Sequence, residues 1–187
     1  MRSHQQRSTN LSEACANFER VFVLGIDPGV SRCGYGCVTG DSRSMRATSA
    51  GVITTPPDDP LPQRLAALAA ELRALVAELH PDAVSVERVF FQTNARTAMS
   101  VGQASGLALL VAAEAGCPVA QYTPNEVKMA VTGYGAAPKA QVQQMVQSLL
   151  GLTERPRPPD TADALALAIC HLSLAPRLAR VAEGSAR

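Results

Sequence analysis

The sequence predicts an α/β domain in which a mixed, five-stranded sheet is flanked by helices. Three observations support this prediction. Residues 21–54 contain three extended segments with short connections, which is typical of an antiparallel meander. A long amphipathic segment and a short apolar segment follow, and a strand, a helix and a second strand form a parallel pair. The apolar residues are mainly Ala, Leu and Val, which suits helices packed on a sheet.

The length and composition predict one domain with loose ends. A chain of 187 residues with 47% hydrophobic content can bury one sizeable core, which we place at residues 20–173. Residues 1–19 lack periodicity and are predicted to form a flexible leader, and residues 174–187 a flexible C-terminal tail. No apolar run reaches the ~20 residues that cross a bilayer, and the amino terminus is too polar for a secretory signal. We therefore expect a cytoplasmic protein.

Charge and cysteine content exclude several classes of protein. The net charge of +1 argues against a protein that coats nucleic acid by bulk charge, although a nucleic-acid enzyme could gather its basic residues on one face. Five cysteines form an odd set without a C-x-x-C pair, so neither a zinc site nor a disulfide framework is predicted.

The strands and helices are predicted from local patterns. The first strand, 21–27, is an uninterrupted run of β-formers that ends on Asp27 and is followed by a Pro-Gly turn. Leucines at helical spacing predict an amphipathic helix over 62–80, and a short strand over 83–87 follows. The other predicted segments are strands at 35–39, 46–54 and 118–122, and helices at 94–116, 124–131, around 142–150 and from Asp160 onward.

Acidic residues stand at the ends of these predicted segments. Asp27 and Glu87 end two strands that we expect to be parallel neighbours, so their carboxyl groups should lie side by side at one edge of the sheet. Asp160 and Asp163 are three residues apart and share a helix face. Each acid also has a structural interpretation: Asp27 in a turn, Glu87 at the surface, and the late pair as helix caps.

Together, the four acids predict a metal-dependent nuclease. Two neighbouring carboxylates repel each other unless a cation bridges them. Oxygen ligands without His or Cys suit Mg²⁺ or Mn²⁺, and two such ions ~3.5–4 Å apart could activate a water and stabilise the leaving oxygen of a phosphodiester.

The sequence also resembles the RuvC family of bacterial Holliday-junction resolvases, which have a ribonuclease H-like fold. The resemblance covers roughly residues 21–172. It rests on the joint occurrence of V-L-G-I-D-P-G (23–29), G-Y-G (34–36), V-E-R-V-F (86–90), Gly102-Gln103, Val127-Lys128, A-A-P-K-A-Q-V (136–142) and D-T-A-D-A-L-A (160–166).

The resemblance implies a homodimer that nicks two strands of a four-way DNA junction with magnesium, two ions per site, in recombination and repair. It implies catalytic and metal-binding roles for Asp27, Glu87, Asp160 and Asp163, and the RuvA-RuvB branch-migration complex as a partner. Basic residues near the scissile phosphate fall on Lys128 and Lys139, which could otherwise be solvated helix charges, and an aromatic residue that stacks on an unpaired base falls on Phe90.

Two features depart from the family pattern, and three other functions stay open. Ser105 stands where many relatives carry Arg, so a phosphate contact is not expected there, and residues 1–19 have no counterpart. The alternatives are a related nuclease with another nucleic-acid substrate, a junction-binding module that does not cleave, and an actin-like ATPase or kinase. The last is disfavoured because the chain has one domain and no Walker motif.

Overall fold

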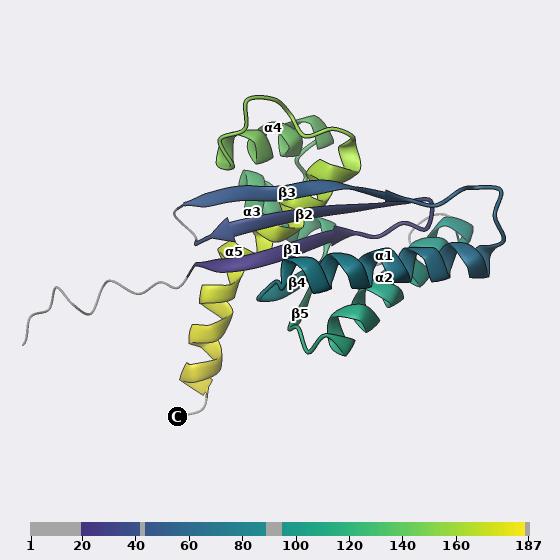
Figure 1. The fold of residues 1–187 in the computed structure, drawn as a ribbon. Helices are drawn as coiled ribbons and strands as arrows, with labels where there is room; N and C mark the ends of the chain where they lie inside the picture. Colours follow the sequence, from purple (N-terminus) through teal and green to yellow (C-terminus); the bar gives the residue numbers. More distant parts are fainter. Residues whose placement is uncertain (1–19, 42–43, 89–94, 186–187) are drawn as a thin grey trace, which may run out of the picture.

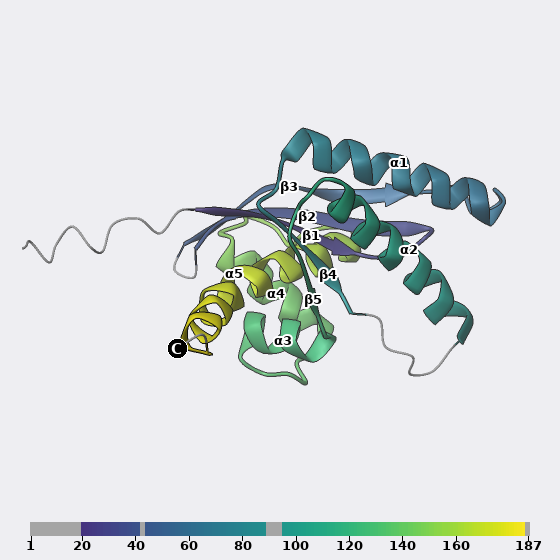
Figure 2. The same ribbon diagram turned by 90° about the horizontal axis from the view of Figure 1, so that it is seen from below.

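The computed structural model of the protein describes residues 20–41, 44–88 and 95–185. In chain order, its elements are β1 (Val21–Asp27), β2 (Arg32–Gly40), β3 (Met45–Thr54), α1 (Leu61–Leu79), β4 (Ala83–Glu87), α2 (Ala95–Glu114), β5 (Val119–Tyr122), α3 (Pro124–Thr132), α4 (Lys139–Leu149) and α5 (Pro159–Ser185). Figures 1 and 2 show three layers, with α1 and α2 on one face of the sheet and α3, α4 and α5 on the other. Within the described ranges, no helix is long and apolar enough to cross a membrane.

The sheet is mixed and five-stranded, which confirms the predicted fold class. Its strand order is β3-β2-β1-β4-β5. The strands β1, β2 and β3 form an antiparallel meander because short connections join them. β4 is parallel to β1, and β5 is parallel to β4, since each is reached through a crossover helix. The parallel strands β1, β4 and β5 therefore end at the same edge of the sheet.

Two hydrophobic clusters fill the spaces on either side of the sheet. On one face, Leu68 and Leu72 of α1 pack against the strands, together with side chains such as Leu24 of β1. On the other face, α5 contributes Leu165 and Ile169, which are almost fully buried. Burial of each such side chain contributes ~1.5–3 kcal/mol relative to exposure. This packing fixes the position of α5, on which the site depends.

The ends of some elements differ from the prediction. α5 continues to Ser185, so the predicted domain boundary at residue 173 falls inside a helix. The segment after it is rich in Leu, Ala and Arg, which are strong helix formers. That this tail is flexible stays a prediction, and the predicted leader, residues 1–19, lies outside the described residues. β2 begins at Arg32, three residues earlier than predicted.

Candidate active site

Two glycines let α5 lie directly against β1 and β2. A Cβ atom at Gly25 would overlap the backbone of Ala164, and one at Gly34 would overlap the carbonyl group of Asp160. Only glycine permits so close an approach of two backbones. Gly34 is also the antiparallel partner of Asp27. The first turn of α5, which carries Asp160, is therefore held beside the end of β1.

The alternation of side chains along each strand places two acids on the face that α5 covers. Asp27 follows Gly25 by two residues, so both face α5. On β4, Oγ of Ser85 donates a hydrogen bond to the carbonyl oxygen of Leu167 in α5 (2.9 Å), and Glu87 follows Ser85 by two residues. The parallel register of β1 and β4 brings the two acids to the same level. Neighbouring strands are ~4.8 Å apart, so these side chains lie at one edge of the sheet.

Asp160 and Asp163 lie in the first two turns of α5, and each is paired with a cation. Nε and Nη2 of Arg32, the first residue of β2, donate to Oδ2 of Asp160 at 3.2 and 2.8 Å. Nζ of Lys139, the first residue of α4, donates to Oδ2 of Asp163 at 2.6 Å. The helix dipole also favours negative charge at this end of α5, so stabilisation of the helix start and a role in binding a cation are compatible.

Burial and neighbouring charges shift the pKa values of Asp27, Glu87 and Asp160. The pKa of Asp27 is raised from 3.8 to about 7, first by burial and then by the negative charges of the other three acids. Burial and the charge of Asp163 raise the pKa of Glu87. Burial acts in the same direction on Asp160, but hydrogen bonds, chiefly with Arg32, and the positive charges of Arg32 and Lys139 together outweigh it and lower the pKa of that group. The negative charge of the cluster is only partly compensated, a condition that favours a bound cation.

Both lysines of the sequence lie beside the acids. Lys128 and Lys139 line a pocket of about 250 Å³ together with Glu87 and Asp163. Apolar side chains of α3, α4 and α5 form the rest of its wall. The positive charges of Lys139 and Lys128 act to lower the pKa of Glu87, against the effect of burial. The pocket thus combines carboxylates with two flexible ammonium groups that suit a phosphate.

Two other residues considered from the sequence are not part of this cluster. Phe90 lies outside the described residues. Ser105 is 4% exposed and belongs to α2, on the face of the sheet opposite α5. Its side chain is therefore inside the protein and not at its surface.

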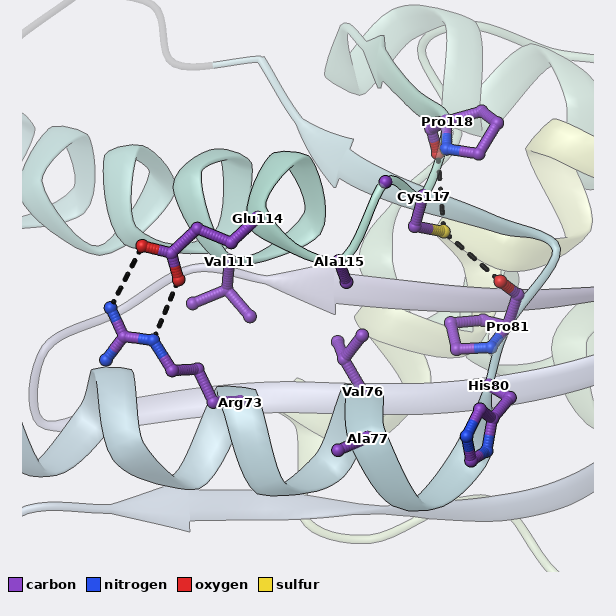
Figure 3. Close-up of a pocket in the computed structure, with 11 residues that line it drawn as sticks. Arg73, Val76, Ala77, His80, Pro81, Val111, Glu114, Ala115, Cys117 and Pro118 are labelled. Carbon is purple, nitrogen blue, oxygen red and sulfur yellow. Dashed lines mark hydrogen bonds and ion pairs between the residues drawn. The ribbon is translucent and has the colours of Figure 1, made fainter.

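A second hollow lies at the opposite end of β4. It has a volume of about 420 Å³ and lies between the C-terminal ends of α1 and α2, where Arg73 and Glu114 form an ion pair at 2.8 Å (Figure 3). Figure 3 also shows that Cys117 donates its thiol hydrogen to the carbonyl oxygen of Pro81. This hollow contains a single acidic side chain, so it offers no set of oxygen ligands.

The four carboxylates fit a hard divalent cation in their chemistry, although they are not assembled around one. Within residues 20–41, 44–88 and 95–185, no three Asp, Glu, Cys or His side chains are grouped so as to hold an ion as they stand. Two of the four carboxylates are engaged by Arg32 and Lys139. Both ion pairs are partly exposed, and such pairs are weak, so they are compatible with a divalent cation among these oxygen ligands.

Sequence reasoning missed the basic groups that support the site from β2 and α1. The contact of Arg32 with Asp160 joins residues 128 positions apart, and no local pattern signals it. Arg64 of α1 donates from Nε to Oγ1 of Thr55 (3.0 Å) and from Nη2 to Oγ of Ser31 (2.5 Å). The bond to Ser31 ties α1 to the loop between β1 and β2, which follows Asp27.

The chain is similar to known proteins in both sequence and fold. The family model described as "Crossover junction endodeoxyribonuclease RuvC" matches residues 23–171. The protein of that name from Moorella thermoacetica is 51% identical over 167 residues, which cover 89% of this chain and 100% of the relative. The one from Salinispora arenicola is 59% identical over 151 residues, 80% of this chain and 86% of the relative. The structure of Thermus thermophilus RuvC in complex with a Holliday junction substrate is 40% identical, with a TM-score of 0.79, and the match covers 83% of this chain and 94% of that one.

Proposed function

The chain belongs to the RuvC family of crossover junction endodeoxyribonucleases, and from this premise we propose that Asp27, Glu87, Asp160 and Asp163 form its catalytic metal site. Family membership makes it an endonuclease of DNA recombination and repair with a ribonuclease H-like fold, whose activity depends on divalent metal. The other functions that the sequence left open are therefore not favoured. We propose Mg²⁺, two ions per site, with Mn²⁺ as a substitute.

One observation carries this proposal: two distant segments, β4 and α5, bring three acids near Asp27, and the pKa of that partly buried group rises to about 7. An ionised carboxylate in such a place is costly unless a cation compensates it. Four carboxylates supply the oxygen ligands that Mg²⁺ prefers. A divalent cation would thus supply the positive charge that the four carboxylates lack.

The roles of the residues follow from their positions. When bound, Mg²⁺ would supply Lewis acidity for the attack of a water on the phosphodiester and for the departure of the leaving oxygen. Asp27 and Glu87, at the ends of neighbouring strands, would hold the cation from the sheet, and Asp160 and Asp163 would hold it from α5. Because Lys128 and Lys139 share a pocket with two of these acids, we propose that they bind and orient the scissile phosphate.

The proposal extends to the substrate and the assembly. The substrate is a four-way DNA junction, as in the complex of the Thermus relative. A homodimer would match the two-fold symmetry of that substrate and supply one active site per cut. We further propose stacking of Phe90 on an unpaired base, cooperation with the RuvA-RuvB branch-migration complex, and a cytoplasmic location.

Cleavage of a synthetic four-way junction tests the function directly. The wild-type protein should nick two strands of like polarity only when Mg²⁺ or Mn²⁺ is present. Asp27→Asn should abolish cleavage and leave junction binding in a gel-shift assay, because an amide replaces one ligand without disturbing the sheet. Arg73→Gln, far from the acids, is the control and should cleave normally. Retained cleavage by Asp27→Asn would refute the assignment, and joint loss of binding and folding would make Asp27 structural.

A further inference from the structure

The ion pair between Arg32 and Asp160 occupies one of the proposed metal ligands. Two donors of the guanidinium, Nε and Nη2, converge on the same oxygen, Oδ2 of Asp160. Arg32 lies two residues before Gly34 on β2, so its side chain emerges on the face that α5 covers. The antiparallel register places Gly34 opposite Asp27. The guanidinium therefore reaches Asp160 from beside the acid cluster.

We propose that Arg32 is a positioning residue that serves as an exchangeable counter-ion for Asp160. Without metal, it holds and neutralises the Asp160 carboxylate, and a divalent cation must displace it to bind. Arg32 thereby sets the metal concentration at which the site fills. This inference rests on the proposed function, because it requires Asp160 to be a metal ligand.

The exposure of the pair supports exchange rather than a permanent bond. The side chain of Arg32 is 49% exposed and that of Asp160 is 27% exposed. Ion pairs with this much access to water contribute little to stability, whereas a divalent ion binds several carboxylates at once. The long arginine side chain can also remain solvated after it leaves the carboxylate.

The charge of the acid cluster determines whether loss of Arg32 strengthens or weakens metal binding. The four carboxylates outnumber the cations that pair with them, since Arg32 and Lys139 engage one each. Removal of the Arg32 charge frees an oxygen of Asp160 and also removes a positive group that repels the incoming ion. Both consequences favour metal binding. A residue that merely oriented Asp160 for the metal would have the opposite effect, because its loss would leave the ligand disordered.

Titration with Mn²⁺ in the absence of DNA tests this proposal without reference to catalysis. The concentration of free Mn²⁺ is followed by electron paramagnetic resonance for the wild-type protein and for Arg32→Gln. We expect the half-saturating Mn²⁺ concentration of Arg32→Gln to be roughly three- to tenfold lower, from the lost competition and the lost repulsion. Arg32→Lys keeps the charge but loses the fork of two donors, so its value should lie between the two.

Arg73→Gln is the matched control. Arg73 forms the same kind of half-exposed ion pair, with Nε and Nη2 directed at Glu114, but far from the acids. Its Mn²⁺ affinity should equal that of the wild type. Equal shifts for the two variants would attribute the effect to overall charge and overturn the proposal. Unchanged or weaker binding by Arg32→Gln, with folding verified by circular dichroism, would overturn it as well.

Asp160→Asn separates this inference from the function on which it rests. Loss of Mn²⁺ affinity in Asp160→Asn, together with unchanged affinity in Arg32→Gln, would leave the metal site intact and reject only the role of Arg32. Unchanged Mn²⁺ affinity in Asp160→Asn would instead show that Asp160 is not a metal ligand, and the proposed role of Arg32 would then be rejected as well.

Discussion

The partly buried Asp27 carboxyl group should make the metal-free protein less stable as the pH rises. Its pKa is about 7 in the folded state and 3.8 as an isolated group. Between these values the folded state binds more protons than the unfolded state, so the free energy of unfolding falls as the pH increases. The contribution is most favourable below pH 3.8 and is lost progressively up to about pH 7. A shift of about three pKa units corresponds to a total loss of about 4 kcal/mol.

Asp27→Asn should remove this pH dependence, because an amide does not ionise. From the same two pKa values, the wild-type protein should lose about 2 to 3 kcal/mol between pH 5 and pH 8.5 through this group. The difference in unfolding free energy between the variant and the wild type should therefore shift by that amount in favour of the variant from pH 5 to pH 8.5. This shift does not depend on how much the substitution changes stability at pH 5. Other titrating groups are common to both proteins and largely cancel in the difference.

Urea denaturation in EDTA at several pH values measures the effect, at one fixed protein concentration because assembly would also alter stability. Asp58→Asn, in the exposed turn before α1, makes the same chemical change away from the cluster and should follow the wild type. Parallel curves of unfolding free energy against pH for the wild type and Asp27→Asn would refute the reasoning. Added Mg²⁺ should stabilise the wild type more than the variant, since a ligand that binds only the folded state stabilises it.

Two further substitutions test the surroundings of the cluster. Lys128→Ala should weaken junction cleavage. It should also reduce the slope of log affinity against log salt concentration, measured by fluorescence anisotropy, by about one phosphate contact. An unchanged slope would make Lys128 an ordinary surface charge. Gly34→Ala should destabilise the protein by roughly 1–3 kcal/mol in thermal or urea unfolding, because its methyl group overlaps the backbone of Asp160. Gly106→Ala, whose methyl group would meet nothing within 4 Å, should instead be neutral or stabilising by up to ~1 kcal/mol, and equal losses in the two variants would contradict the close packing of α5.

The strands that carry the first two acids could be predicted from sequence because their signals are local. The apolar run before Asp27 and the short strand before Glu87 end where predicted, and the crossover helix between them dictates that they are parallel. A parallel pair whose strands both end in acids brings those acids to one edge of the sheet. The position of Asp160 and Asp163 at a helix start is predictable for the same local reason, and α5 begins at Pro159.

The charge state of the cluster could not be predicted in this way, because it depends on contacts between distant segments. The ion pairs of Asp160 with Arg32 and of Asp163 with Lys139 span 128 and 24 residues. The pKa of Asp27 depends on how deeply α5 buries it and on the acids that α5 carries. None of these quantities has a local signature, since each is a function of distance and desolvation.

The sequence by itself thus determined the order of the elements, the mixed sheet and the positions of four acids at element ends. Only the tertiary structure decided how far the negative charge of the acids is compensated, because this depends on the close approach of α5 to the sheet. Backbone contact at Gly25 and Gly34 brings the helix within reach of β1 and β2. Burial and Coulomb repulsion then act on carboxyl groups that the sequence keeps far apart, and they leave the cluster in need of a cation.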